Sequence, residues 1–402
     1  MKSLRTLAVP VVLVLMAGLA TACSSSSSTP STTTSSLKGT PIDLGVISEI
    51  TSSTPSGEVV SGAKAAAAAI NASGGIKGHP VVITACDSKD VPDVAAATTC
   101  ANNLVANSAT VAEVGDYNAN QQQINTILAA AGVPLIGPNP VSASAFSSSN
   151  SFPLMGLEGA GLTTVLQHFN YKKISVAYTD VAAAAQAVTF GDLVLKPYGL
   201  SVLQGIPVPL TATDLTAEVT QATKGDAAGL ALEPSQLAQW LTVSKQGNYK
   251  TAVSASAGSI TPPTLKSLGD TANGMYLAGG LPFSTNTKLS GIQKFQAEMK
   301  QYEPSALVDE PSENAWVATW AAAQVMRTMT VPITRASLMT AMGQLTNFNV
   351  FGLLPAGFQT VKEFNFPSLN RLFNQSVIYG QVKNQALVQT DPNWVVVLKP
   401  LS

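Results

Sequence analysis

The fold is decided by the stretch Ile42-Asp-Leu-Gly-Val-Ile47, Ser48-Glu-Ile-Thr-Ser-Ser-Thr-Pro-Ser-Gly57 and Pro80-Val-Val-Ile-Thr84, with an alanine-rich run between the last two. The first run is apolar and rich in branched residues, which favours a buried parallel strand. The second is a polar loop in which Thr54 and Pro55 predict the N-cap and first residue of a helix. Residues 59–70 repeat apolar side chains at helical spacing, and the last run predicts a second strand. The polar loop therefore lies at the carboxyl end of a strand, where open α/β sheets bind ligands.

The same order of strand, polar loop and helix recurs along the chain. Residues 110–115 and 133–136 predict strands, followed by the polar loops 116–121 and 137–142. Near residue 156 a second series begins, with strands predicted at 174–178, 202–208, 228–232, around 253 and at 274–278. Repeated units of this kind predict parallel sheets whose polar loops gather at one edge.

The segment Ala69-Ile-Asn-Ala-Ser-Gly-Gly-Ile-Lys-Gly78 closely resembles the helix and turn of periplasmic leucine/isoleucine/valine-binding proteins, the amino-acid branch of the type I substrate-binding proteins of ABC transporters. Ala85-Cys86-Asp87, Val114-Gly115 and Val133–Ile136 fall in that family's order. The resemblance runs from about Pro41 to the C-terminus. It implies an α/β fold of two lobes, each a mostly parallel sheet flanked by helices, joined by multiple hinge crossovers. We expect residues 41–155 and 281–350 in the N-terminal lobe, and 156–280 and 351–402 in the C-terminal lobe.

The N-terminus predicts export. Lys2 and Arg5 precede an apolar run over 7–19, and Ala20-Thr-Ala-Cys23 follows. This pattern is typical of a bacterial lipoprotein signal peptide over residues 1–22, with Cys23 as the lipid-bearing residue at the outer face of the cell membrane. An ordinary secretory signal with an incidental cysteine is the alternative. Residues 23–40 are mostly Ser, Thr and Pro, which predicts a flexible tether.

The composition limits the classes of partner. Charged residues make up 11% of the 402 residues and the formal net charge is −1, so no basic face for nucleic acid is expected. No apolar run after the signal is long enough to span a bilayer. We expect a small-molecule solute and a membrane ABC permease as partners, no cofactor and no metal. We also expect a monomer, although no motif speaks to oligomeric state.

Two cysteines remain when Cys23 is set aside. Cys86 ends a predicted strand and Cys100 lies on the helix that follows it. In an exported protein this pair predicts a structural disulfide, with two buried free thiols as the alternative.

No catalytic constellation stands out. The sequence lacks a Gly-x-Ser-x-Gly motif and a phosphate-binding Gly-x-x-x-x-Gly-Lys loop. His79 lies in a Gly-His-Pro turn, and His168 lies near the end of a predicted surface helix. We therefore expect no enzyme. The competing hypothesis is an extracellular enzyme that uses Glu49 and Asp116 as a carboxylate pair.

A ligand site is predicted where the polar loops converge. Its candidate residues are Glu49, Asp116, Tyr117, Asn118, Ala119, Asn139, Pro140, Asp180, Glu233 and Ser235. The resemblance implies that loops 116–120 and 138–142 hold a ligand carboxylate and that an acid on the second lobe holds its ammonium group. Here Ala119 and Val141 replace the family's hydroxyl residues, and the expected acid corresponds to Ser256 or Ala257. The loops therefore fit a neutral or weakly polar solute as well as an amino acid.

These observations predict an extracytoplasmic solute-binding lipoprotein of an ABC importer that captures a small polar or amino-acid-like solute by hinge closure. Two other functions remain open for the same fold. One is a ligand-sensing lipoprotein that signals to a membrane receptor. The other is a lipoprotein that binds no solute and acts through protein contacts.

Overall fold

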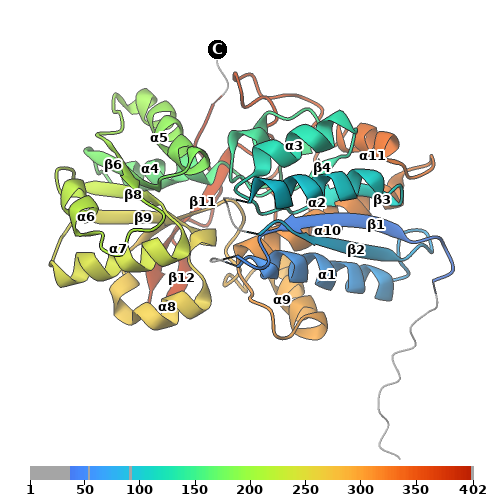
Figure 1. Cartoon of the computed structure of the whole chain (residues 1–402), viewed down its shortest axis with the longest axis horizontal. Coiled ribbons are helices and arrows are strands. Elements are labelled where there is room, and N and C mark those ends of the chain that lie inside the picture. Colours follow the sequence, from blue (N-terminus) through green and yellow to red (C-terminus); the bar gives the residue numbers. More distant parts are fainter. Residues whose placement is uncertain (1–36, 53–54, 90–92, 400–402) are drawn as a thin grey trace, which may run out of the picture. The chain divides into compact units, whose positions relative to one another are not determined.

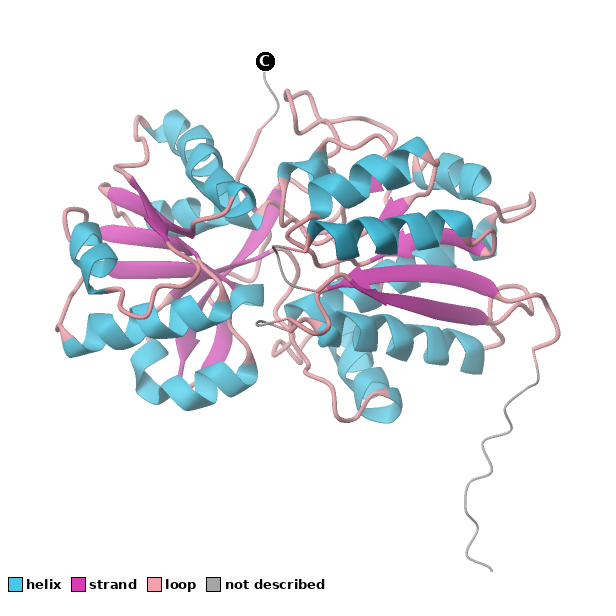
Figure 2. Ribbon diagram, in the orientation of Figure 1, coloured by secondary structure: helices cyan, strands magenta, loops and turns pink. Residues whose placement is uncertain are grey.

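The computed structural model describes residues 37–52, 55–89 and 93–399. The predicted signal peptide, Cys23 and nearly all of the predicted tether lie outside these residues. The described chain forms two sheets flanked by helices, and the segments that join them cross between the two lobes (Figures 1 and 2). None of the helices in the described part of the chain is long and apolar enough to cross a membrane.

The first lobe contains a parallel sheet with the strand order β2-β1-β3-β4-β5. Its strands are β1 Ile42–Ser48, β2 Val81–Asp87, β3 Thr110–Val114, β4 Leu135–Ile136 and β5 Ser151–Phe152. Its helices are α1 Gly57–Ala72, α2 Val94–Ala106, α3 Gln121–Ala130, α9 Ser290–Tyr302, α10 Glu310–Thr328 and α11 Arg335–Met342, with the short 3-10 helix η1 Ala143–Phe146. The parallel order agrees with the repeated units in the sequence.

Both faces of the first sheet are covered by helices. Leu44 and Val46 of β1 are fully buried with residues of α1, α9 and α10, whereas Ile47 is buried with α2 and α3 on the other face. Gly45 lies under α2, where a Cβ atom would come within 2.3 Å of Leu104 Cδ2. A strand buried on both faces explains why β1 is apolar without alternation.

The second lobe contains a mixed sheet with the order β12-β11-β10-β9-β8-β6-β7. Its strands are β6 Ile174–Thr179, β7 Gly205–Val208, β8 Ala227–Ala231, β9 Ala252–Ser256, β10 Tyr276–Gly279, β11 Ser376–Lys383 and β12 Ala386–Gln389, and β13 Val395–Val396 pairs with β11. Its helices are α4 Glu158–His168, α5 Ala182–Leu195, α6 Thr216–Ala222, α7 Pro234–Gln246 and α8 Pro262–Leu268, with 3-10 helices η2 Lys196–Tyr198, η3 Ala257–Ser259 and η4 Gly269–Ala272. Strands β6 to β10 run parallel, and β11 is antiparallel to β10 and β12.

Helices α9 and α10 pack in the core of the first lobe. Trp316 on α10 is fully buried in the first core. Trp240 on α7 is likewise buried in the second core. Leu353 and Phe358, which follow the predicted lobe boundary at residue 350, still pack in the first core, and the chain joins the second sheet at Ser376.

The predicted start of the first helix is wrong. Helix α1 begins at Gly57, and Pro55 lies in the preceding loop, while Thr54 lies outside the described residues. The Ser56 N–H donates to the Glu49 carbonyl at 2.9 Å, and Ser48 Oγ donates to the Ser56 carbonyl at 2.8 Å. These bonds close a loop after β1, and they keep Pro55 out of the helix.

Three crossover segments join the lobes, near residues 153–157, 280–284 and 374–376, and they contact one another. The Gly156 N–H donates to the Gly280 carbonyl at 3.1 Å, and Asn374 Nδ2 donates to the Leu154 carbonyl at 3.2 Å. A Cβ atom on Gly156 would lie 1.8 Å from the Ser376 carbonyl oxygen. Only glycine therefore permits this close approach of two crossover segments.

The Cys86–Cys100 disulfide is present and joins the end of β2 to α2. We expect the double substitution Cys86→Ala/Cys100→Ala to lower the free energy of unfolding by about 3 kcal/mol, because the cross-link restricts the unfolded chain over 14 residues. Urea unfolding of the mature body, with and without reductant, measures this loss. Reductant should destabilise the wild type by a similar amount and leave the double variant unchanged; an unchanged wild type would contradict the prediction.

Candidate functional site

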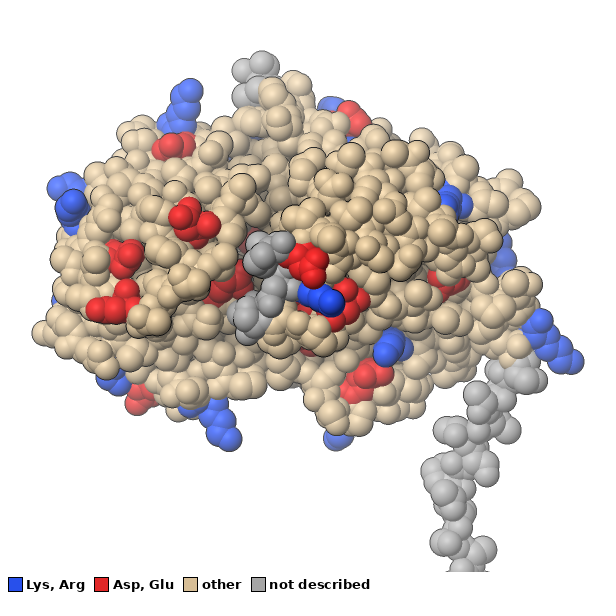
Figure 3. Space-filling model, in the orientation of Figure 1, with Lys and Arg blue, Asp and Glu red and all other residues tan. Residues whose placement is uncertain are grey.

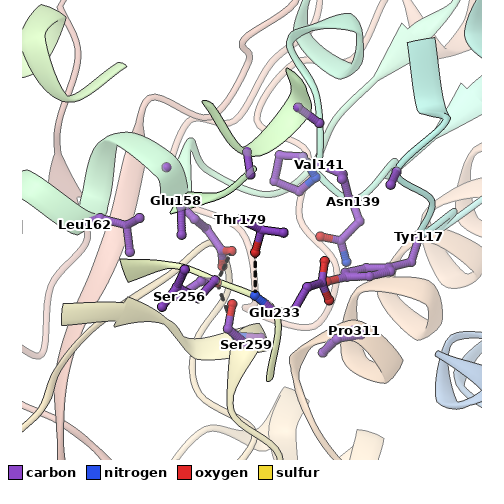
Figure 4. A pocket seen from close by; sticks show the side chains of 18 of the residues that line it. Tyr117, Asn139, Val141, Glu158, Leu162, Thr179, Glu233, Ser256, Ser259 and Pro311 are labelled. Carbon is purple, nitrogen blue, oxygen red and sulfur yellow. Dashed lines mark hydrogen bonds between the residues drawn. The ribbon is translucent and has the colours of Figure 1, made fainter. Parts of the chain in front are cut away.

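A cavity of about 150 Å³ lies where loops from both sheets meet (Figure 4). Its lining includes residues from loops after β3, β4, β6, β8 and β9, together with the starts of α4 and α10. These residues are Tyr117, Ala119, Asn139, Pro140, Val141, Met155, Glu158, Gly159, Leu162, Thr179, Val181, Ala183, Ala184, Leu230, Ala231, Leu232, Glu233, Ser256, Gly258, Ser259, Glu310 and Pro311. A cavity of this volume accepts a molecule about the size of benzene.

Half of the predicted ligand residues line this cavity. They are Tyr117, Ala119, Asn139, Pro140 and Glu233. Figure 4 shows the carboxylate of Glu233 beside the ring of Tyr117, with the amide of Asn139 above them. Burial, and then the nearby acids with Glu233 first among them, raises the pKa of the Tyr117 hydroxyl well above its usual range. Tyr117 therefore stays protonated and can donate a hydrogen bond.

Ser235 and Asp180 do not line this cavity. Ser235 is exposed and lines an adjacent cavity of about 540 Å³ that shares Tyr117 and Glu233 with the first. Asp180 is exposed in the short loop after β6, where its N–H donates to the Val208 carbonyl at 2.8 Å.

Glu49 and Asn118 are buried and hold the loop after β3. Glu49 Oε1 accepts the Ala119 N–H at 2.8 Å. Asn118 Oδ1 accepts the Asn120 N–H at 2.6 Å, and Asn118 Nδ2 donates to Ser88 Oγ. These contacts fix the backbone on which Tyr117 and Ala119 stand.

Asp116 forms a buried acidic pair with Glu113 behind the same loop. Gln121 Nε2 donates to both Asp116 carboxylate oxygens, at 3.2 and 3.1 Å. Burial raises the pKa of Asp116 to about 7. Burial, and then repulsion from Asp116, raises the pKa of Glu113 well above its usual range. Glu49 and Asp116 are thus engaged with the fold, and the structure offers no support for their use as a catalytic pair.

Glu158 and Glu310 are cavity residues that the sequence reasoning missed. Both carboxylates accept a hydrogen bond from the Gly280 N–H, through Glu158 Oε1 at 2.6 Å and Glu310 Oε1 at 2.8 Å. Glu310 Oε1 also accepts the Leu281 N–H at 3.1 Å, and Ser256 Oγ donates to Glu158 Oε2. We call Glu158 and Glu310 the acid pair; it connects the cavity with a crossover segment.

The pKa values of both members of the acid pair are raised. Burial, followed by repulsion from Glu158, raises the pKa of Glu310 well above its usual range. Burial also raises the pKa of Glu158, although hydrogen bonds from Glu310, Ser256 and Gly280 oppose that shift. Two ionised carboxylates so close together in a buried site would repel strongly.

A weak sequence signal for both residues existed. Glu158 stands among glycines in Gly156-Leu-Glu-Gly-Ala-Gly161, where the second series of units begins, and Glu310 precedes Pro311 at a helix start. The acid that the resemblance implies after β9 is absent, because Ser256 occupies that place. The Glu158 carboxylate, however, is hydrogen-bonded to Ser256, so an acid reaches the same region from α4.

The face that Figure 3 shows is mainly uncharged, with a few acidic and basic side chains grouped near its centre and others spread over the rest. No group of three His, Cys, Asp or Glu side chains that could hold a metal ion occurs among residues 37–52, 55–89 and 93–399. The site consists of an apolar cavity with a few convergent polar groups, as in small-molecule binding sites.

Comparison with known proteins identifies the family. A family model described as periplasmic binding protein matches residues 41–377, so the chain belongs to this family of type I binding proteins. A search of curated proteins found no match.

Solved structures share the fold at low sequence identity. A possible leucine/isoleucine/valine-binding protein from Rhodopirellula baltica has a TM-score of 0.77 and 14% identity, over 88% of this chain and 97% of that one. A solute-binding protein of an ABC transporter from R. palustris, in complex with 4-hydroxybenzoate, has a TM-score of 0.73 and 16% identity, over 90% and 97%. A branched-chain amino acid transporter substrate-binding protein from Streptococcus pneumoniae, in complex with isoleucine, has a TM-score of 0.70 and 17% identity, over 88% and 99%.

We expect Glu113→Gln to stabilise the protein more at pH 8 than at pH 5. The pKa of Glu113 is higher in the folded state than in the unfolded state, so the protonated carboxyl stabilises the fold. This stabilisation is complete below the unfolded-state pKa and is lost as pH rises towards the folded-state pKa. The advantage of Gln should grow by up to about 1.4 kcal/mol per pH unit over that window. Urea unfolding at both pH values tests this, with Glu303→Gln at the end of α9 as the control. An equal effect at the two pH values would contradict it.

Proposed function

We propose that this protein is the solute-binding component of an ABC importer and that it captures a small solute in the cavity between its lobes. The observation that carries the proposal is the lining of that cavity by strand-end loops of both sheets. A ligand there contacts both lobes at once, and its binding energy favours the closed arrangement over an open one. Membership of the periplasmic binding protein family supports the same function.

Closure of the two lobes would change the backbone dihedral angles of the crossover segments. They carry Gly156 and Gly280, and their mutual hydrogen bonds keep them adjacent. Rotation about such short segments moves each lobe as a body, which is the hinge type of domain closure. We propose lobe boundaries within these segments, close to residues 155 and 280 as the sequence predicts.

The residues that we propose to contact the solute come from both lobes. From the first lobe they are Tyr117, Ala119, Asn139, Pro140 and Val141, and from the second Glu158, Leu162, Thr179, Glu233, Ser256 and Ser259, with Glu310 from α10. Glu49, Asp116 and Asn118 act on the solute indirectly, because they position the loop that carries Tyr117.

We expect Ala184→Trp to abolish solute binding. Ala184 lines the cavity in the first turn of α5, and an indole ring there would fill most of its volume. The matched control is Ala182→Trp, because Ala182 is exposed on the same turn and does not line the cavity.

Mass spectrometry of gently purified, then denatured protein identifies the bound solute, and thermal unfolding with the recovered solute measures its binding. At 100 times its dissociation constant the solute should stabilise the wild type and Ala182→Trp by about 2.7 kcal/mol, and Ala184→Trp by none. Equal stabilisation of both variants would place the solute elsewhere. A wild type that carries and binds no solute would overturn the proposed function.

We further propose that Cys23 carries the lipid that anchors the protein to the outer face of the cell membrane, beside its permease. The sequence around Cys23 supports this. Cys23→Ala should abolish incorporation of labelled fatty acid and shift the protein from the membrane fraction to the soluble exported fraction. Cys86→Ala/Cys100→Ala should stay lipid-labelled, and labelled Cys23→Ala would contradict the proposal.

A further inference from the structure

All charged residues that line the cavity are acidic. Three acids line it, Glu158, Glu233 and Glu310, and none of the described residues around it is Lys, Arg or His. Other charged groups near the acid pair are also acidic, since Glu313 adds to the repulsion on Glu310 and Asp309 to that on Glu313. A cationic group inside this cavity would be attracted from several sides.

The first-lobe loops offer little to an anion. The Ala119 N–H donates to Glu49 Oε1 at 2.8 Å, so a carboxylate of the chain itself already occupies that donor. The Val141 N–H donates to the Asn139 carbonyl at 2.8 Å, and Pro140 has no N–H. An incoming carboxylate would have to displace Glu49 or lie next to it.

Two buried polar atoms of the lining lack a hydrogen-bond partner within the described part of the chain. They are Glu310 Oε2, on a residue 4% exposed, and Asn139 Nδ2, on a residue 6% exposed. A buried polar group without a partner costs about 1–3 kcal/mol. Both atoms belong to the first lobe, one at the start of α10 and one in the loop after β4, and together they present an acidic oxygen and a hydrogen-bond donor to a ligand in the cavity.

We propose that the solute carries a positively charged nitrogen and an uncharged hydrogen-bond acceptor but no carboxylate, with the nitrogen at Glu158 and Glu310 and the acceptor at Asn139 Nδ2. This inference rests on the proposed solute-binding function. Glu233 adds negative charge at the opposite side of the cavity, and Met155, Leu162 and the small side chains of α5 contact the apolar part of the solute. The solute class is therefore a small amine with an apolar body.

Binding of such an amine releases a proton. Burial and mutual repulsion raise the pKa values of the acid pair, so the pair keeps a proton to higher pH than ordinary carboxyl groups do. A bound cation favours the ionised pair and lowers those values. The affinity for an amine should therefore rise as pH increases through the range in which the acid pair ionises, whereas the affinity for a neutral solute should not rise with it.

The test uses sets of probes with the same carbon skeleton and different charge. Each set is an amine, the matching alcohol and the matching carboxylate, with propyl, isopentyl and phenylethyl skeletons, applied to the mature body in thermal unfolding and titration calorimetry. We expect the amine of at least one set to bind at least tenfold more tightly than its alcohol and carboxylate. Calorimetry in two buffers with different ionisation enthalpies should then show proton release.

Glu310→Gln should weaken amine binding at least tenfold and remove the proton release, because the amide keeps an oxygen for Gly280 and Leu281 but carries no charge. Glu303→Gln is the control, and melting curves without probe establish that both variants fold. A carboxylate that binds as well as its amine would overturn the inference, as would a panel with no binding amine. A neutral or anionic solute released from the purified protein would overturn it and leave the proposed function standing.

Discussion

The Gly280 N–H donates to carboxylate oxygens of both Glu158 and Glu310, and this shared hydrogen bond connects helices of both lobes with a crossover segment. One acid starts α4 of the second lobe, the other starts α10 of the first, and Gly280 lies in a segment that crosses between them. A buried acid pair costs free energy unless it is hydrogen-bonded and shares a proton. The pair therefore connects the starts of α4 and α10 with the crossover segment beside the cavity.

The same physical pattern recurs behind the loop after β3. Glu113 and Asp116 are fully buried, with raised pKa values, and Gln121 connects Asp116 to the loop after β4. Glu49 completes this support by accepting the Ala119 N–H. A chain with only 11% charged residues thus places several of its acids in the interior, around the site, where each ionisation affects stability. Such placement is typical of functional sites.

The sequence predicted the two-lobed fold because its signals are local and repeated. The apolar run 42–47, the helical spacing over 59–70 and the recurring polar loops each reflect short-range rules, and the resemblance set their order. The start of α1 was misplaced because hydrogen bonds from Ser48 and Ser56 hold Pro55 in the loop, and propensity at a helix start does not reveal them. Tertiary contacts override such weak local preferences.

The sequence by itself determined which loops form the cavity, because the carboxyl ends of parallel strands lie at one edge of a sheet. Tyr117, Asn139 and Glu233 were predicted from these loops, and all three line the cavity. Tertiary structure alone decided what each acid does. The sequence does not distinguish Glu49 and Asp116 from ligand-binding acids. In the structure Glu49 accepts the Ala119 N–H and Asp116 accepts from Gln121, so both carboxylates are bound within the fold. Glu158 and Glu310 are 152 residues apart (310 − 158), and only the crossing of the chain between lobes brings them onto one N–H group. A local sequence pattern cannot predict a contact between residues so far apart in the chain, because that contact depends on how the two lobes pack.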